Sequence, residues 1–102
     1  MSNVYYSPED FGLVIVAEID SGGSYEFDQV VVWRDRAGDL WGAHDCGCSC
    51  PTPFEYIKYP EGMTPIKAPE DVRPLLDGMS AYSLDNLSSV LLFADKVREA
   101  LR

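Results

Sequence analysis

The single histidine and all three cysteines of the chain lie within seven residues, at alternate positions. They are His44, Cys46, Cys48 and Cys50. Imidazole and thiolate groups are preferred zinc ligands, and four of them complete a tetrahedral site. A zinc site is therefore the first chemical hypothesis for this chain, with copper(I) as the soft-ion alternative.

An extended backbone argues against one ion held by all four residues. Alternate side chains of a strand share a face but advance by about 3.3 Å per residue, which places His44 and Cys50 about 20 Å apart. The chain would have to curl tightly, which Gly47 permits. Familiar zinc knuckles draw a second ligand pair from elsewhere in the sequence, and this sequence has no second pair.

Three other interpretations of the cysteines stay open. A disulfide between Cys48 and Cys50 would be a strained redox element, because residues two apart reach disulfide geometry only if the chain bends. A thiolate with His44 as its base would be a nucleophile, which requires hydrogen-bond contact and a substrate cleft. The simplest interpretation is that the cysteines pack as small apolar residues at a strand end, with Phe54 anchoring the segment after them.

Most of the net charge of −9 belongs to the first half of the chain. Up to Glu55 there are ten acidic residues and two arginines, whereas from Tyr56 onward seven acidic residues meet six basic ones. The first half should repel nucleic-acid phosphates, so we expect no direct nucleic-acid binding, and it should attract basic protein surfaces. Keeping a small sheet soluble is the simpler role for the same charges.

The elements that carry these residues begin with a period-2 pattern, which is typical of strands. The odd-numbered residues from Leu13 to Ile19 are apolar, and Tyr25, Phe27, Val31 and Trp33 continue the pattern, so we expect this odd face to be the core side. The loop at 20–24 and the turn at Asp35 to Gly38 predict three antiparallel strands in a meander. On the solvent face, four acids are candidate contacts for a protein partner: Glu18, Asp20, Glu26 and Asp28.

The second half predicts a proline-rich crossover and two helices. Five of the seven prolines lie between Pro51 and Pro69, so we expect no regular structure there, although its aromatic residues should keep it against the sheet. Pro69 starts a short helix that Gly78 ends. Ser83 caps a C-terminal amphipathic helix, whose expected buried stripe is Leu84, Leu87, Leu91, Ala94, Val97 and Leu101. Leu92 and Phe93 either widen that stripe or mark a partner or dimer surface.

The length of 102 residues predicts one domain, residues 1–102. The longest apolar run, from Leu13 to Ala17, is far shorter than the roughly 20 residues that span a bilayer, and the N-terminus lacks signal-peptide features. We therefore expect a cytoplasmic protein without membrane association, in a compartment that keeps thiols reduced.

The chain also resembles a family of small, uncharacterised proteins of actinobacterial bacteriophages. The resemblance rests on four stretches between Tyr5 and Glu55: Tyr5-Tyr-Ser-Pro-Glu-Asp-Phe-Gly-Leu13, Gly23-Ser-Tyr-Glu-Phe-Asp28, Val32-Trp-Arg-Asp35 and Gly47-Cys-Ser-Cys-Pro-Thr-Pro-Phe-Glu55. It implies a phage origin and action in the host cytoplasm, without a known activity. The family pattern includes Cys48 and Cys50 but not reliably Cys46 or His44, so a four-ligand site would be peculiar to this chain.

The sequence therefore predicts an α+β protein in which a three-stranded meander is followed by a proline-rich crossover, a short helix and a C-terminal helix packed on the sheet. We expect a non-enzymatic phage accessory protein, without a cofactor, that binds a host or phage macromolecule through its acidic sheet face. We expect a monomer or homodimer with a protein partner. The alternatives are a metal-binding or redox module that uses the cysteines, with zinc as its ion, and a DNA mimic that inhibits a host enzyme.

Overall fold

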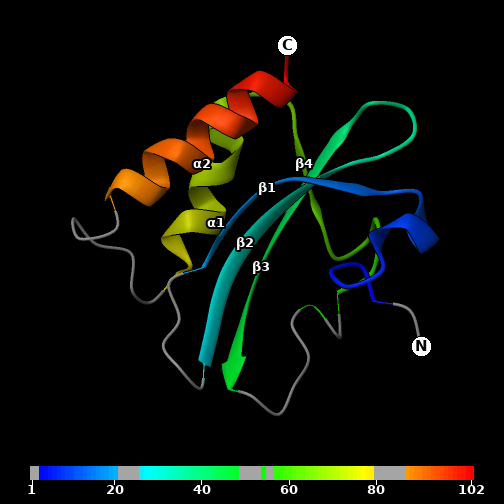
Figure 1. The fold of residues 1–102 in the computed structure, drawn as a ribbon, viewed down its shortest axis with the longest axis horizontal. Helices are drawn as coiled ribbons and strands as arrows, with labels where there is room; N and C mark the ends of the chain where they lie inside the picture. Colours follow the sequence, from blue (N-terminus) through cyan, green and yellow to red (C-terminus); the bar gives the residue numbers. More distant parts are fainter. Residues whose placement is uncertain (1–2, 21–25, 49–53, 55–56, 80–86) are drawn as a thin grey trace.

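The computed structural model describes residues 3–20, 26–48, 54, 57–79 and 87–102. Its elements in chain order are a 3-10 turn η1 (Pro8–Phe11), strands β1 (Val14–Asp20), β2 (Glu26–Arg34), β3 (Leu40–Cys48) and β4 (Thr64–Ile66), a second 3-10 turn η2 (Pro69–Val72), and helices α1 (Arg73–Asp77) and α2 (Leu87–Ala100). Both helices lie on one side of the sheet and the N-terminal segment lies on the other (Figure 1). The predicted α+β class with an antiparallel sheet is confirmed.

The prediction of three strands is wrong, because the sheet has four, in the order β1-β2-β3-β4. The fourth strand lies in the proline-rich segment, where we expected no regular structure, and pairs antiparallel with β3. Pro65 stands inside it, opposite Trp41. A proline is tolerated here because β4 is three residues long and forms an edge of the sheet, so one side of its backbone needs no ladder hydrogen bond.

The predicted turn between β2 and β3 is confirmed. Gly38 has a φ of 93°, in the left-handed region that glycine adopts without strain, and its N–H donates to the carbonyl of Asp35 at 3.1 Å. The Asp35 carboxylate oxygen Oδ1 accepts the N–H groups of Ala37 and Asp39, both at 2.9 Å. This local set of hydrogen bonds closes the central hairpin.

Both faces of the sheet are buried, so the expectation of a single apolar face is wrong. Four consecutive residues of β2 are 0 % exposed: Val30, Val31, Val32 and Trp33. Val30 and Val32 belong to a core that includes Phe93 of α2, whereas Val31 and Trp33 belong to a second core. We call these the helix-side core and the N-terminal-side core. An uninterrupted apolar run is the pattern of a strand that is covered on both faces.

The edge strand β1 contributes to both cores because it contains a bulge. Its register with β2 shifts between Ile15 and Ala17. Leu13 and Ile15 belong to the N-terminal-side core, whereas Val16, Ala17 and Ile19 belong to the helix-side core. A β-bulge inserts one extra residue, so the residues after it face the opposite side from the one that simple alternation predicts.

The helix α2 packs on the sheet through a stripe that keeps Val97 and Leu101 of the predicted one and includes Phe93 in place of Leu91. Phe93 is 2 % exposed and Val97 is 0 % exposed, whereas Leu91, which we placed on the buried stripe, is 55 % exposed. Partly buried residues extend the observed stripe: Val90, Ala100 and Leu101. Steps of three and four residues fit either stripe, and the observed one buries the large Phe93 ring. The predicted cap Ser83 and the predicted stripe residue Leu84 lie outside the described residues.

In the described part of the chain, no helix is long and apolar enough to cross a membrane.

Phe54 holds the proline-rich segment against the sheet, as expected. It is 1 % exposed, and its ring meets the Trp33 ring edge-on with the centroids 5.3 Å apart. Its N–H donates to Asp45 Oδ2 at 2.8 Å. Trp33 Nε1–H in turn donates to the carbonyl of Val4 at 2.9 Å, so the N-terminal segment joins the same core.

We predict that Phe54→Ala lowers the free energy of unfolding by about 3–5 kcal/mol, because it removes a fully buried aromatic ring. Urea unfolding followed by tryptophan fluorescence measures this change. Tyr6→Ala is the matched control, because Tyr6 is 62 % exposed and its truncation should cost less than about 1 kcal/mol. Equal losses in the two variants would contradict the role given to Phe54.

Candidate metal centre

The four acids that we expected on one solvent face are not all on that face. Asp28 is only 4 % exposed, so its assignment as a surface contact is wrong. Glu18 and Asp20 pair with Val31 and Gln29, on the N-terminal-side face of the sheet, whereas Asp28 lies on the helix side. Strand alternation separates them, because Asp28 is one residue from Gln29 and so faces the other way. The side chain of Glu26 lies outside the described part.

Glu18 and Asp20 are exposed, but their carboxylates accept hydrogen bonds within the chain. Glu18 Oε1 accepts the Tyr5 hydroxyl at 2.8 Å, which ties β1 to the N-terminal segment. Asp20 Oδ1 accepts the backbone N–H of Asp28 at 3.2 Å, and Asp20 Oδ2 accepts Gln29 Nε2 at 3.4 Å. Both acids therefore have a structural role in addition to any role in binding.

Of the four predicted zinc ligands, the structure describes the side chains of His44 and Cys46. Both belong to β3, two residues apart, and therefore share the helix side of the sheet. Cys48 is the last residue of this strand, and its side chain and all of Cys50 lie outside the described residues. The backbone is extended as far as Cys48, so the expected spread of ligand positions along one strand is present to that point.

The third ligand-type residue beside His44 and Cys46 is Asp28, which comes from the neighbouring strand. The register of β2 with β3 sets Asp28 opposite Cys46 and Val30 opposite His44. Asp28 is thus a direct cross-strand neighbour of Cys46 and a diagonal neighbour of His44. One ligand atom each from Asp28, His44 and Cys46 lies within 4.8 Å of the other two. We call these three residues the Asp–His–Cys cluster.

The sequence alone identified two members of the cluster, His44 and Cys46. It assigned the third member, Asp28, to a surface contact instead. The signal for Asp28 was nevertheless present in the sequence. Once the turn at Asp35 to Gly38 is assigned, counting outward along both strands sets Asp28 opposite Cys46. A search for ligands along one strand misses this pair, because the register joins residues 18 positions apart in the chain.

His44 is held between the sheet and the end of α1. Its Nε2 shares a hydrogen bond with Asp28 Oδ1 at 2.6 Å, and the two side chains are 20 % and 6 % exposed. On its other side lies Gly78, where an added Cβ would be 3.1 Å from His44 Nδ1. Glycine at this position lets the end of α1 approach the imidazole ring closely, which restricts how the ring can turn.

The cluster offers one carboxylate, one imidazole and one thiol, which is the donor set of a borderline-soft divalent ion. The same three groups would form a nucleophile, a base and a carboxylate that orients the base if the thiol met the second ring nitrogen. Asp28 already occupies Nε2, so a thiol nucleophile could meet only the other ring nitrogen, Nδ1, which faces Gly78. The arrangement fits metal binding better than thiol catalysis.

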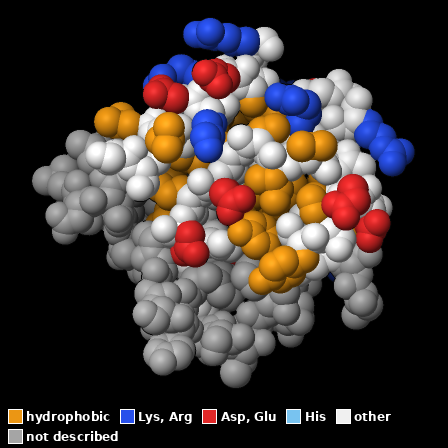
Figure 2. All heavy atoms as spheres, in the orientation of Figure 1, with side chains coloured by type: hydrophobic (Ala, Val, Ile, Leu, Met, Phe, Trp, Pro, Cys, Tyr) orange, Lys and Arg blue, Asp and Glu red, His pale blue; other side chains and the backbone are white. Residues whose placement is uncertain are grey.

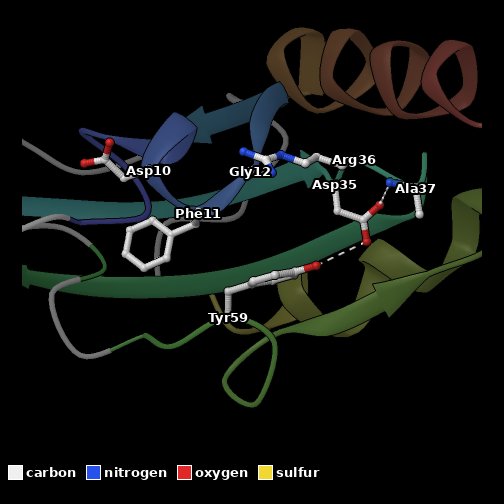
Figure 3. Close-up of a pocket in the computed structure, with 7 residues that line it drawn as sticks. All are labelled: Asp10, Phe11, Gly12, Asp35, Arg36, Ala37 and Tyr59. Carbon is white, nitrogen blue, oxygen red and sulfur yellow. Dashed lines mark hydrogen bonds between the residues drawn. The ribbon is translucent and has the colours of Figure 1, made fainter.

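A separate hollow of about 460 Å³ lies near η1 and the β2–β3 turn (Figure 3). It is lined by Asp10, Phe11, Gly12, Asp35, Arg36, Ala37 and Tyr59. The Arg36 side chain lies across Gly12, where a Cβ would come within 2.9 Å of its Nε. The Tyr59 hydroxyl donates to Asp35 Oδ2 at 3.2 Å, and Trp41 Nε1–H donates to the same oxygen at 2.9 Å.

Asp35 is a structural anchor of this hollow rather than a catalytic acid, because its two oxygens together accept four hydrogen bonds. The Trp41 ring N–H is the largest cause that lowers the pKa of Asp35, the Asp39 N–H and the Tyr59 hydroxyl add to it, and burial opposes them. Burial raises the pKa of Tyr59, and the charge of Asp35 raises it further. The carboxylate therefore stays ionised and keeps the turn closed.

We predict that Asp35→Asn destabilises the protein most at neutral pH. A carboxyl whose pKa is lower in the folded state than its ordinary value of 3.8 stabilises the fold above that value, and this contribution is lost as the pH falls through the folded pKa. The difference in unfolding free energy between wild type and Asp35→Asn should therefore be constant at neutral pH and narrow below about pH 4. Urea unfolding at a series of pH values measures this difference.

Trp41→Phe provides the comparison, because it removes the largest cause of the lowered pKa and keeps the carboxyl. As the pH is lowered into the acid range, the free energy of unfolding of Trp41→Phe should fall less steeply than that of wild type. A deficit of Asp35→Asn that is the same at pH 7 and at pH 3 would contradict the anchoring role of Asp35.

The chain is similar to a known protein family. The curated proteins contain no significant match to the chain, and neither do the solved structures. The profile of one family, described as the domain of unknown function DUF7574, matches residues 2–101 and thus nearly the whole chain. The chain therefore belongs to the family of the domain of unknown function DUF7574.

Proposed function

We propose that this protein is a small metal-binding protein that holds one zinc ion through Asp28, His44 and Cys46. The observation that carries the proposal is the convergence of three different ligand groups, from two strands, within 4.8 Å of one another. Cross-strand pairing brings Asp28 to the cluster, and alternation along β3 brings the other two. A rigid hairpin therefore positions all three groups.

The donor set favours zinc over a hard ion. Zinc binds nitrogen and oxygen at about 2.0–2.2 Å and thiolate sulfur at about 2.3 Å, whereas magnesium prefers an all-oxygen shell. In this proposal the 2.6 Å contact of His44 Nε2 with Asp28 Oδ1 opens slightly, and the ion takes the place of the shared proton. Only side-chain adjustments are needed, because the backbone register already brings the groups together.

The exposure of the cluster suggests an open coordination position. Cys46 is exposed and His44 is half-buried, while Asp28 is buried. Three protein ligands leave the fourth position of a tetrahedral ion to water or to a donor atom of another molecule. We assign no reaction to the ion and propose that its role is binding.

The acidic surface remains a weaker proposal for the site of a protein partner. Asp28 lies on the opposite face from Glu18 and Asp20, and the carboxylates of those two residues accept hydrogen bonds within the chain. A DNA mimic would need its charges gathered on one surface, which the separation of Asp28 disfavours. The net charge of −9 supports the proposal that the protein does not bind nucleic acid directly.

The cellular setting is part of the same proposal. The four sequence stretches between Tyr5 and Glu55 that resemble actinobacteriophage proteins support a phage origin and action in the host cytoplasm. A reducing cytoplasm suits the cluster, because it keeps Cys46 available as a thiol, and the side chain of Cys46 is free in the structure.

We predict that untagged wild-type protein binds one equivalent of Zn²⁺, and that Cys46→Ser weakens binding on the order of a hundredfold, or about 2.7 kcal/mol. Isothermal titration calorimetry measures the affinity. Co²⁺ substitution provides a spectroscopic signature, since a thiolate-to-cobalt charge-transfer band requires a bound sulfur. Affinity should fall as the pH is lowered, because protons compete for the ligand groups.

The double variant Cys48→Ser, Cys50→Ser is the matched control, because it removes two thiols and leaves the Asp–His–Cys cluster intact. It should keep the charge-transfer band and the zinc affinity. If this variant loses the ion and Cys46→Ser keeps it, the ion belongs to the cysteine segment after β3 and the proposed ligand set is wrong. If the wild type binds no zinc, the proposed function is wrong.

Zinc should also stabilise the fold, because the ligands converge only in the folded chain. At a free zinc concentration of 100 times the dissociation constant, we predict a gain of about 2.7 kcal/mol in the unfolding free energy of the wild type. Asp28→Asn should gain much less, and Mg²⁺ in place of Zn²⁺ should give no gain. Thermal unfolding with and without each ion makes the comparison. An equal gain in wild type and Asp28→Asn would exclude Asp28 as a ligand.

A further inference from the structure

Gln29 of β2 carries a buried polar atom without a partner. The residue is 6 % exposed, and its side-chain oxygen Oε1 is buried and accepts no hydrogen bond. It is the only side-chain atom of this kind in the part of the chain that the structure describes. Burying an amide oxygen without a donor is unfavourable, so such an atom in a folded protein indicates a place for a water molecule or an ion.

The amide of Gln29 lies among oxygen atoms on the N-terminal-side face of the sheet. Its Nε2 donates to Asp20 Oδ2 and to the Tyr5 hydroxyl, both at 3.4 Å. The Tyr5 hydroxyl in turn donates to Glu18 Oε1 at 2.8 Å. Two carboxylates and a phenol therefore surround the end of one buried amide. We call Tyr5, Glu18, Asp20 and Gln29 the oxygen cluster.

The charges around the oxygen cluster favour a cation over a water molecule. Glu18 and Asp20 lie on the same face of β1, two residues apart, so their carboxylates repel each other. Lys96 of α2 lines a hollow of about 200 Å³ beside both acids, but it forms no ion pair within the described residues. In the view of Figure 2, basic side chains gather around the C-terminal part of α2, and acidic side chains extend well below it. A bound cation would supply the counter-charge that the side chains leave incomplete.

A turn of the Gln29 amide by 180° about its Cγ–Cδ bond would add a third kind of oxygen ligand to the two carboxylates. The turn exchanges the places of Oε1 and Nε2, because both atoms belong to one planar group. Oε1 would then lie about 3.4 Å from Asp20 Oδ2, where Nε2 lies now. Two oxygens bound at right angles to a calcium ion, at about 2.3–2.6 Å each, are about 3.3–3.7 Å apart, whereas around magnesium they are about 2.9 Å apart.

The turned amide also has an acceptor for its N–H groups. Gln29 pairs in register with Asp20 of β1 on one side and with Asp45 of β3 on the other. An amide whose oxygen faces Asp20 directs its nitrogen toward the side of Asp45. The Asp45 carboxylate already accepts the N–H of Phe54 through Oδ2, at 2.8 Å, and a carboxylate has room for further donors.

We propose that the oxygen cluster binds one calcium ion through Glu18, Asp20 Oδ2 and Gln29 Oε1, with the Tyr5 hydroxyl holding the Glu18 carboxylate in place. Carboxylate and amide oxygens are the ligands that calcium prefers, and water completes its shell from the exposed side of the two acids. The ion gives the buried Gln29 oxygen the partner that it lacks. The site is separate from the proposed zinc site, because the Asp–His–Cys cluster lies on the other face of the sheet.

The test titrates untagged, chelator-treated full-length protein with CaCl₂ in a calorimeter. Wild type should bind one equivalent with a dissociation constant of about 10⁻⁴–10⁻³ M, the range of sites with few charged ligands. Glu18→Gln should weaken binding at least about tenfold. Glu9→Gln is the matched control, because it makes the same change of charge at an exposed acid of η1 outside the cluster, and it should leave the affinity unchanged. Circular dichroism checks that both variants fold.

Gln29→Glu separates an ion ligand from a residue that only packs. It places a carboxylate oxygen where the proposal places Oε1, so it should tighten calcium binding several-fold and make the thermal stability of the protein depend more strongly on calcium. Cys46→Ser should bind calcium as wild type does. A wild type that binds no calcium would overturn the proposal. Equal weakening in Glu18→Gln and Glu9→Gln, no tightening in Gln29→Glu, or loss of calcium in Cys46→Ser would overturn it too.

Discussion

The register of the central hairpin is the constraint on which the rest of this structure depends, and the Asp35 carboxylate fixes it. One oxygen of Asp35 binds two backbone N–H groups of the turn, and the other binds the Trp41 ring N–H and the Tyr59 hydroxyl. From this turn the β2–β3 pairs run without a shift to the far end of both strands. A slip of one residue would turn every side chain of a strand to the other face, which two buried faces do not allow.

Burial on both faces explains how about one hundred residues form a stable core. The four consecutive buried residues Val30 to Trp33 serve two cores at once. Helix α2 and the α1 region cover one face, while the N-terminal segment and Phe54 cover the other. The bulge in β1 lets a single edge strand supply apolar residues to both cores.

The proposed zinc site depends on the same register. Asp28 would be an unfavourable buried carboxylate by itself, and pairing across the hairpin places it next to His44. Gly78 lies on the other side of the imidazole, where an added Cβ would come within 3.1 Å of Nδ1. An ion that replaced the proton between Asp28 and His44 would use groups that the fold has already brought together. A catalytic site would need a substrate cleft as well, so a metal site explains this cluster with fewer requirements.

The sequence by itself determined the α+β class, the turn at Asp35 to Gly38, the anchoring of Phe54 and two of the three residues in the Asp–His–Cys cluster. These features rest on local signals: strand periodicity, glycine in a left-handed turn, and neighbouring residues with ligand chemistry. Only the tertiary structure decided the fourth strand, the two-sided core, the buried stripe of α2 and the place of Asp28. Each of these depends on contacts between residues far apart in the chain. A bulge of one residue reverses the faces of β1, and the packing of Phe93 selects one stripe where the spacing of α2 allows two.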